Sequence, residues 1–482
     1  MGLAVCKRPC CWGRCGPCCH GAPGEEGSGS GTAGTHRANR FKSVYSYMPR
    51  TSQDLCLQKG EVFEVLHDHG QWLFVQQGER TGYVPRAFAA SEDSLEAKDW
   101  YFGKLSRLDA KRFLLQPMNA DGAFLVWWNE EVDCYYLSVR IRNLARHYQI
   151  QASSNTFYLV QRKKFPSLEK LLKHYYNNAD GLCTKLELPC AKLDAPSLPS
   201  LSHNTIGDLE IQPRSFEKIK ELGSGAFGTV WLAKWNGTTE VAIKELQVSA
   251  ESMKNKMQDE AETMWKLNHE RVLKLYAVCL NADPVFIVTE YMRNGSLRRY
   301  LKGHRPKRDL GFHSLVDFSI QIAQGMDYME RMGCVHCDLR SDNILLTEML
   351  SCKIGDFGLA SFTDNQSIQV IADMKLPIKW MAPEVFICCR YSIKSDVWSF
   401  GVLLVEIMTY GRIPFPDINN QAYINNMFTR SPLSAPEGCP ENMADIMRLC
   451  WAMERTDRPP FKDLEKNLTK LIDAGLAEDM VQ

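Results

Sequence analysis

The 482-residue sequence shows no excess charge of either sign and no long apolar run. Lys plus Arg and Asp plus Glu number 57 each, so no overall electrostatic field favours nucleic acid as a partner. No apolar stretch approaches the roughly 18 residues that a transmembrane helix needs, and no secretory signal is present. The 18 cysteines do not suggest a disulfide framework, because those in the body are scattered through apolar contexts such as Val278-Cys279-Leu280. We therefore expect a cytoplasmic protein that binds no nucleic acid and has about three domains.

The segment His336-Cys337-Asp338-Leu339-Arg340-Ser341-Asp342-Asn343 is the most informative part of the chain. It follows the pattern H-R-D-L-x-x-x-N of a protein-kinase catalytic loop, with Cys337 in place of the arginine. Asp338 stands where a base accepts the proton of a substrate hydroxyl, and Asn343 stands where an amide oxygen binds magnesium. The loop predicts phosphoryl transfer.

A glycine-rich loop and a lysine that follows it, both N-terminal to the catalytic loop, predict the nucleotide site. The loop pattern G-x-G-x-x-G-x-V also occurs in dinucleotide folds, but here Val241-Ala242-Ile243-Lys244 follows, with Lys244 16 residues after Gly228, which excludes that alternative. Lys244 would hold the α- and β-phosphates. A helix expected over 251–267 offers Asp259, Glu260 and Glu262 as anions that would hold Lys244, and the resemblance to the kinase pattern matches Glu260. The predicted nucleotide-binding residues are Leu222, Gly223, Ser224, Gly225, Ala226, Phe227, Gly228, Val230, Lys244, Thr289, Glu290 and Met292.

Further motifs follow in the order and spacing of a kinase domain. Asp356 begins Asp-Phe-Gly 13 residues after Asn343 and would bind the metal together with it. Met381-Ala382-Pro383-Glu384 and Arg458-Pro459 come later, and we expect Glu384 and Arg458 to form a buried ion pair. The full ordered set predicts a kinase fold over residues 216–472.

Four other regions precede this domain. Residues 1–38 form a cysteine-rich, glycine/serine-rich segment that cannot bury a core, so we expect disorder there. Short strand-like runs over 39–92 predict a small β-barrel. Residues 99–191 read as helix 106–115, strands 123–126 and 135–139, and helix 167–176, and residues 192–214 form a linker.

From Phe41 onward the chain resembles a Src-type non-receptor tyrosine kinase, and within that family the Fyn-related kinase/Brk branch. The resemblance implies a multidomain protein with an all-β SH3 barrel, an α+β SH2 domain and an α+β bilobal kinase domain. It also implies ATP with Mg²⁺ or Mn²⁺ as cofactors and a role in signal transduction. Arg340, two residues after Asp338, and the platform Pro377-Ile378-Lys379-Trp380 favour tyrosine as the phosphate acceptor. The catalytic residues carried over are Asp338, Asn343, Lys244, Glu260 and Arg340.

The SH3 resemblance implies proline-rich ligands, which bind an aromatic groove. The residues matching that groove are Tyr45, Tyr47, Trp72, Pro85 and Phe88. Asp54 matches the acid that pairs with a ligand arginine. Pro196-Ser197-Leu198-Pro199 is a candidate internal ligand, and an ordinary linker is the alternative.

The SH2 resemblance contains one sharp departure. Trp127 occupies the position of the arginine that binds phosphotyrosine through two hydrogen bonds, and an indole offers only one neutral donor. Arg107, Arg146 and His147 remain nearby and would compensate in part. We expect weak or no phosphotyrosine binding and a structural role for this domain.

The sequence also departs from the family in its control elements. Residues 359–381 contain no tyrosine, Ile368 falls on the family's phosphorylated tyrosine, and no tyrosine follows Tyr423. Because Cys337 replaces the arginine that pairs with this phosphate, we expect an enzyme without these phosphotyrosine switches. A catalytically weak pseudokinase that acts as an adaptor through its SH3 domain is the alternative.

The amino terminus suggests a lipid-anchored protein. Met1-Gly2 fits the start of a myristoylation signal, although Cys6 replaces the preferred Ser or Thr. Nearby cysteines could carry palmitate, which would hold a cytoplasmic protein at the plasma membrane. A zinc cluster and a solvated tail are the alternatives.

Overall fold

The computed structural model describes the chain from Arg40 to Asp479, with interruptions. The undescribed stretches in this span are 131, 154–155, 193–194, 197, 199, 204–208, 226–227, 247–250, 363–367, 370–376 and 430–432. The predictions for residues 1–38 lie outside the described part. In what is described, no helix is long and apolar enough to span a membrane.

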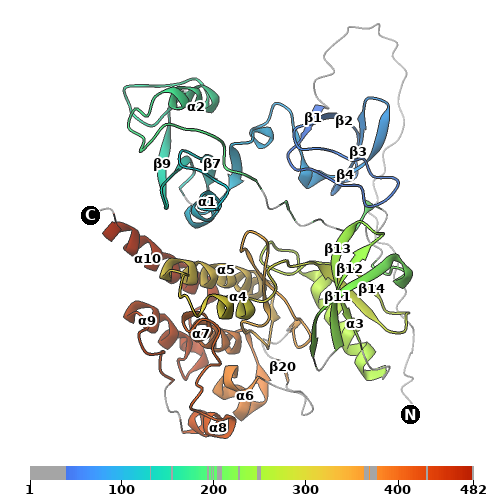
Figure 1. The fold of residues 1–482 in the computed structure, drawn as a ribbon. Coiled ribbons are helices and arrows are strands. Elements are labelled where there is room, and N and C mark those ends of the chain that lie inside the picture. Colours follow the sequence, from blue (N-terminus) through green and yellow to red (C-terminus); the bar gives the residue numbers. More distant parts are fainter. Residues whose placement is uncertain are drawn as a thin grey trace, which may run out of the picture. The chain divides into compact units, whose positions relative to one another are not determined.

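The first described domain is a five-stranded antiparallel sheet in the order β4-β3-β2-β1-β5 (blue in Figure 1). Its elements are β1 (Arg40–Ser43), β2 (Val62–Asp68), β3 (Trp72–Gln77), β4 (Arg80–Pro85), the 3₁₀ turn η1 (Arg86–Phe88) and β5 (Ala89–Ser91). Phe63, Leu73, Val75 and Val84 are buried at its centre, so one apolar cluster fixes the register of the strands.

The second domain is a sheet in the order β10-β9-β8-β7-β6 with one helix against each face. Its elements are η2 (Leu95–Ala97), β6 (Tyr101–Lys104), α1 (Arg107–Leu114), β7 (Phe124–Asn129), β8 (Cys134–Ile141), β9 (Leu144–Ser153), β10 (Thr156–Tyr158) and α2 (Leu168–Asn177). Because successive strand side chains point to opposite faces, Phe124 and Val126 pack with α2, whereas Leu125 and Trp127 pack with α1.

Both helices of this domain begin at serine caps. The Ser106 and Ser167 hydroxyls accept hydrogen bonds from the backbone N–H groups of Asp109 and Lys170, which satisfies donors left free at a helix start. The predicted helices and strands of this region are therefore present, with their bounds shifted by a few residues.

The third domain has two lobes. The smaller lobe is the antiparallel sheet β11-β12-β13-β15-β14 with one long helix. Its elements are η4 (Pro213–Ser215), β11 (Phe216–Gly225), β12 (Gly228–Trp235), β13 (Thr239–Glu245), α3 (Glu251–Lys266), β14 (Leu275–Cys279) and β15 (Phe286–Glu290). Helix α3 contacts β14.

The larger lobe is mostly helical. Its helices are α4 (Leu297–His304), α5 (Phe312–Arg331), η5 (Ile378–Trp380), α6 (Pro383–Cys388), α7 (Ile393–Met408), α8 (Asn420–Phe428), α9 (Glu441–Cys450), η6 (Arg455–Asp457) and α10 (Phe461–Asp479). Short strand pairs join β16 (Cys334–Val335) to β19 (Ser361–Phe362), β17 (Ile344–Leu346) to β18 (Cys352–Ile354), and β20 (Ile368–Gln369) to β21 (Arg390–Tyr391).

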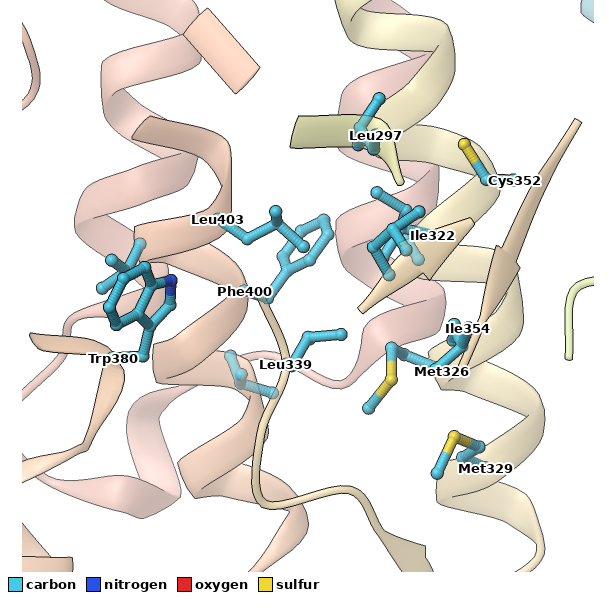
Figure 2. Close-up of a cluster of buried hydrophobic side chains, with 14 of the residues drawn as sticks. Leu297, Ile322, Met326, Met329, Leu339, Cys352, Ile354, Trp380, Phe400 and Leu403 are labelled. Carbon is cyan, nitrogen blue, oxygen red and sulfur yellow. The ribbon is translucent and has the colours of Figure 1, made fainter. Parts of the chain in front are cut away.

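The core of the larger lobe lies directly under the catalytic loop. Figure 2 shows Leu339 of that loop among Ile322 and Met326 of α5 and Phe400 of α7. All four side chains are completely buried. Burying apolar surface of this kind stabilises by about 1.5–3 kcal/mol for each large side chain, so the loop is held by the core on which it lies.

Candidate active site

The catalytic loop is anchored by a buried carboxyl group of α7. Asp396 accepts hydrogen bonds from the backbone N–H groups of His336 (2.7 Å) and Cys337 (3.0 Å). Burial raises the pKa of Asp396 to about 7, against the lowering effect of these two hydrogen bonds. Cys337 has a positive φ of 66°, a conformation that costs a non-glycine residue about 1 kcal/mol or more. The two hydrogen bonds to Asp396 hold the loop in that conformation.

Asp338 and Asn343 lie in contact. The Asn343 Nδ2 group donates to Asp338 Oδ2 and to the Asp338 carbonyl oxygen, both at 2.8 Å. The amide oxygen of Asn343 is thereby left as an acceptor for another group. Burial raises the pKa of Asp338 to about 7, opposed by Arg340 and by the Asn343 hydrogen bond. The loop thus presents a carboxylate whose proton affinity suits general-base chemistry near neutral pH.

Lys244 of β13 joins Glu260 of α3. Its Nζ lies 2.7 and 2.8 Å from the two Glu260 carboxylate oxygens and 3.4 Å from Asp356 Oδ1. Burial favours the neutral amine, but the charges of Glu260 and Asp356 outweigh it and raise the pKa of Lys244. Lys244 is therefore a fixed cation between the two lobes, as the sequence predicted.

The predicted glycine loop is the hairpin between β11 and β12. Gly223 pairs with Val230, Ser224 with Thr229, and Gly225 with Gly228, while Ala226 and Phe227 lie outside the described residues. Gly228 has φ 137°, and a Cβ there would lie 2.0 Å from the Glu245 carbonyl oxygen. A side chain at this position would push the hairpin away from β13, so the sequence needs glycine here.

The connection between the lobes contains the predicted adenine-binding residues. Thr289 and Met292 are buried, and Glu290 ends β15. The Glu290 carboxylate accepts from Lys353 Nζ (2.7 Å) and from the backbone N–H of Lys274 (2.8 Å). The Glu290 side chain is thus committed to structural contacts, and the adenine-binding role of this segment stays a prediction.

Arg340 lies beside the predicted acceptor platform. Its guanidinium carbon is 5.0 Å from the centroid of the Trp380 ring, and its Nη2 donates to Asp342 Oδ2. Trp380 Nε1 donates to Glu406 at 3.0 Å, and Lys379 Nζ donates to the Phe415 carbonyl oxygen at 2.8 Å. The platform is therefore fixed by polar contacts to α7 and to the segment before α8.

Asp342 and Glu406 were given no role by the sequence reasoning, and Asp396 was noted only as part of the kinase motif Ser395–Gly401, with a structural role. Asp342 lies at a variable position of the loop motif, and Asp396 and Glu406 lie on a helix more than 50 residues further along the chain. Asp396 belongs to a segment, Ser395-Asp396-Val397-Trp398, in which an acid stands among otherwise apolar or small residues. A buried acid in such a setting needs partners, and that signal could have identified it.

The Cys337 side chain is buried, and its Sγ donates to the Val335 carbonyl oxygen at 4.0 Å. Cys337 is 4% exposed, and its burial raises the pKa of the thiol well above the ordinary value, so the group is neutral. The backbone of Ile368, in the place of the family's phosphorylated tyrosine, pairs with that of Tyr391. A neutral side chain thus occupies the position where a charged one would need an anionic partner.

The predicted ion pair between Glu384 and Arg458 is present. The two carboxylate oxygens of Glu384 accept from Nη1 and Nη2 of Arg458 at 2.7 and 2.9 Å. The Arg458 side chain is fully buried and also donates to the Lys394 and Ala452 carbonyl oxygens. This ion pair holds the start of α6, which follows the acceptor platform in the sequence.

Trp127, which stands in the place of the family's phosphate-binding arginine, is buried in the second domain. It is 1% exposed, stacks on Tyr136 with ring centroids 4.9 Å apart, and donates from Nε1 to Ser138 Oγ at 2.8 Å. Ser138 in turn contacts His147 Nδ1 at 2.7 Å. The single hydrogen-bond donor of the Trp127 indole is therefore already used within the domain.

The linker crosses the aromatic face of the first domain. Leu198 is buried in the core of that domain, Trp72 Nε1 donates to Ser200 Oγ at 3.1 Å, and the His203 ring stacks on Tyr83 at 3.7 Å. Pro196 is exposed, and the predicted P-x-x-P segment contacts this domain through Leu198; Ser197 and Pro199 lie outside the described residues. Asp54 accepts hydrogen bonds from the Tyr47 hydroxyl (2.7 Å) and the Arg50 N–H (2.9 Å) within the domain, and its pairing with a ligand arginine stays a prediction.

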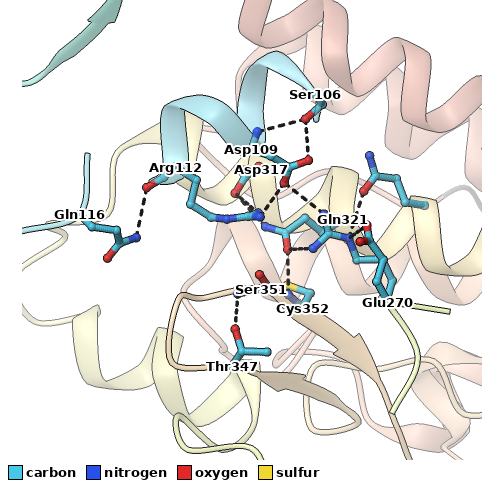
Figure 3. Close-up of polar contacts among 12 residues, drawn as sticks. Ser106, Asp109, Arg112, Gln116, Glu270, Asp317, Gln321, Thr347, Ser351 and Cys352 are labelled. Atoms are coloured by element: carbon cyan, nitrogen blue, oxygen red, sulfur yellow. Dashed lines mark hydrogen bonds and ion pairs between the residues drawn. The ribbon is translucent and has the colours of Figure 1, made fainter. Parts of the chain in front are cut away.

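Helix α1 contacts the larger lobe through a buried ionic network, drawn in Figure 3. Asp109 Oδ1 pairs with Arg112 of the same helix (2.5 Å) and with Arg271 Nη2 (3.1 Å), and Arg112 Nη1 lies 3.6 Å from Asp317. Arg271 also donates to Gln321 at 2.9 Å. We call these residues the α1 network. Its two cations and two anions balance, which compensates for their removal from water.

Together, a two-lobed fold, a fixed lysine between the lobes and a carboxylate–amide pair on the catalytic loop define an ATP-dependent phosphotransferase of the protein-kinase class. Comparison with known families agrees. Residues 216–468 match the family model of protein tyrosine and serine/threonine kinases, residues 100–175 match the SH2 domain, and residues 42–86 match the SH3 domain.

Because the kinase match covers more than half of the sequence, the chain belongs to the protein tyrosine and serine/threonine kinase family. The order SH3, SH2, kinase supports a non-receptor kinase of the Src-family type. The predicted fold class is confirmed. A protein-kinase domain implies ATP, a divalent metal and protein substrates, and SH3 and SH2 domains indicate proline-rich and phosphotyrosine ligands.

Proposed function

We propose that the protein transfers the γ-phosphoryl group of ATP to tyrosine residues of proteins. The observation that carries the proposal is the intact pair of Lys244 with Glu260, at 2.7 Å. Kinases need this pair in place for phosphoryl transfer. A pseudokinase that acts only as an adaptor would not need it, so the contact favours the enzyme over that alternative.

The remaining roles follow from the chemistry of each side chain. Lys244 would bind the α- and β-phosphates, and the hinge backbone near Met292 would receive adenine. Asn343 and Asp356 offer an amide and a carboxylate oxygen, the donors that Mg²⁺ prefers, and Mn²⁺ would fit the same donors. The metal, when bound, supplies charge neutralisation on the phosphates.

Asp338 would act as the base. The acceptor hydroxyl would give its proton to Asp338 while its oxygen bonds the γ-phosphorus and the bond from that phosphorus to ADP breaks. Arg340 and the platform Ile378–Trp380 favour tyrosine, because a phenolic hydroxyl stands farther from the peptide backbone than a serine hydroxyl does. Holding the backbone on a platform fixed by Glu406 and by the Phe415 carbonyl oxygen suits that reach.

One assay tests the activity and the acceptor together. Purified wild type and Asp338→Asn are incubated with ATP, Mg²⁺ and a tyrosine-containing polymer, and with a matched polymer that contains serine and threonine. Wild type should label only the tyrosine polymer, and the variant should be slower by about 10² or more. Equal labelling by the two proteins would refute the enzyme, and labelling of serine would refute the acceptor.

Regulation without phosphotyrosine in the activation segment follows from the composition of residues 359–381 and from the buried, neutral Cys337. A Cys337→Arg variant would place a cation at this buried position, with no phosphotyrosine from residues 359–381 to receive it. We expect no gain in activity from this variant. A many-fold gain would mean that Cys337 impairs an otherwise conventional enzyme.

Weak or absent phosphotyrosine binding by the SH2 domain rests on the burial of Trp127. The domain instead supports the kinase through the α1 network. Isothermal titration of the full chain with phosphorylated and unphosphorylated copies of one tyrosine peptide tests this. Tight binding of the phosphorylated copy alone would refute it. The linker contact with Trp72 and Tyr83 makes the chain's own linker the resident ligand of the SH3 domain, in competition with external proline-rich segments.

Acylation at Gly2 or at the amino-terminal cysteines, the Fyn-related kinase/Brk branch and the domain bounds stay predictions. Intact-mass spectrometry of the amino-terminal peptide from cells would test the first. A myristoyl or palmitoyl mass would support membrane anchoring, and bound zinc would favour the cluster.

A further inference from the structure

Arg340 stands between two carboxylates of the catalytic loop. Asp338 precedes it by two residues and Asp342 follows it by two. In the structure, Arg340 Nη2 donates to Asp342 Oδ2, and Arg298 of α4 reaches the same oxygen through Nη1 at 2.6 Å. Among the described residues, Arg340 makes no hydrogen bond to Asp338. Asp342, and not the base, is therefore the carboxylate that receives the hydrogen bond of Arg340.

This arrangement leaves one oxygen of the base open. Asp338 Oδ2 accepts from Asn343, while Asp338 Oδ1 is shielded from solvent and accepts no hydrogen bond from the described part of the chain. A general base needs a free lone pair within reach of the hydroxyl it deprotonates. A guanidinium turned toward Asp338 would occupy that lone pair with a strong, charge-assisted hydrogen bond.

Asp342 is itself well fixed. It bridges the two arginines, and its pKa is lowered by both, against the effect of partial burial. The guanidinium of Arg340 also rests on the ring of Trp380, a cation–π contact. Arg340 therefore has a stable position that does not use Asp338.

We infer that Asp342 is a positioning residue for the acceptor. It keeps Arg340 on Trp380 and off Asp338, and so leaves Asp338 Oδ1 open to the acceptor hydroxyl. The inference rests on the proposed phosphotransfer and adds a residue to it. It also concerns only the acceptor half of the reaction, since Asp342 contacts none of the residues expected to hold ATP.

The test compares Asp342→Asn with wild type in the full chain, using ATP, Mg²⁺ and the tyrosine polymer. Asparagine keeps the shape and an acceptor oxygen but removes the charge that competes with Asp338 for Arg340. We expect kcat to fall about tenfold, a part of the contribution of a general base, with KM for ATP and the melting temperature unchanged. Asp445→Asn, which breaks a surface pair with Arg448, is the matched control and should behave as wild type.

A second comparison separates positioning from other effects. If Asp342 acts only through Arg340, then Arg340→Ala combined with Asp342→Asn will be no slower than Arg340→Ala alone. An unchanged or raised kcat in Asp342→Asn overturns the inference, as does a parallel loss of ATP affinity or of melting temperature. If wild type labels the polymer no faster than Asp338→Asn, the proposed function fails and this inference fails with it. A wild type that is active while Asp342→Asn equals it refutes the inference alone.

Discussion

Replacing Asp109 with asparagine removes one charge from the α1 network and tests whether the SH2 domain is held on the kinase without phosphotyrosine. Arg271 is 4% exposed and lies 3.1 Å from Asp109. Its other partners are the neutral amides Gln321 and Gln324 and the exposed Glu270. The variant therefore leaves a nearly buried arginine without its nearest anion.

The size of the effect can be worked from the geometry. Removing one partner of a fully buried ion pair costs about 3–5 kcal/mol. The Asp109 side chain is 15% exposed and asparagine still accepts a hydrogen bond, so we expect a smaller cost of about 2 kcal/mol. A free-energy change of 1.4 kcal/mol is about a factor of ten in an equilibrium constant. The state in which α1 is detached from Arg271 should therefore become about 30-fold more populated.

Hydrogen exchange measured by mass spectrometry reads this population. Peptides that cover α1 and residues 268–272 should exchange faster in Asp109→Asn, whereas peptides from α9 should not change. Arg271→Gln should give a similar increase, and the double variant should show less than the sum, with a coupling energy of about 1–2 kcal/mol. Unchanged exchange in α1, or effects of the two substitutions that simply add, would refute a network that joins the domains.

Three further results are expected. Gly228→Ala should abolish the increase in melting temperature on adding ATP and Mg²⁺, because the new Cβ would collide with the Glu245 carbonyl oxygen; an unchanged increase would contradict the close approach. Glu384→Gln should destabilise the kinase domain by about 3 kcal/mol in urea, because Arg458 loses its carboxylate inside the protein, and a loss below about 1 kcal/mol would contradict it. Burial and nearby cations lower the pKa of His147 to about 3, below its unfolded value of about 6.5. The unfolded state therefore binds the extra proton, and the free energy of unfolding falls as pH falls below 6.5. Between pH 7.5 and pH 5.5, wild type should lose about 1 kcal/mol more of this free energy than His147→Gln. Equal losses in the two proteins would contradict the prediction.

The parts of this protein that could be predicted from sequence are those set by local patterns. Helix 251–267 and its Glu260 were expected from the spacing of kinase motifs, and the structure places that carboxylate on Lys244. The ion pair of Glu384 with Arg458 was expected in the same way. In both cases a charged residue of a known motif needs one partner of opposite charge, and the structure places the expected partner next to it.

The contacts that escaped prediction join residues far apart in the chain. No local pattern connects Asp109 to Arg271, 162 residues away, or Trp72 to Ser200, 128 residues away. The linker contact includes Leu198 of the predicted P-x-x-P segment and extends to Ser200 and His203, which the motif did not indicate. Apolar and aromatic side chains outside a proline motif also contact the groove on which a linker docks, so the motif alone indicates only part of the contact.

Trp127 shows how a departure from a family pattern acquires physical meaning in the structure. From sequence it was the replacement of the arginine that binds phosphotyrosine. In the structure the indole is buried, donates to Ser138 and stacks on Tyr136. An arginine at this buried position would need an anion to balance it. Cys337, at the position of the catalytic-loop arginine, is likewise buried and neutral, so both departures from the family pattern place an uncharged side chain at a buried position.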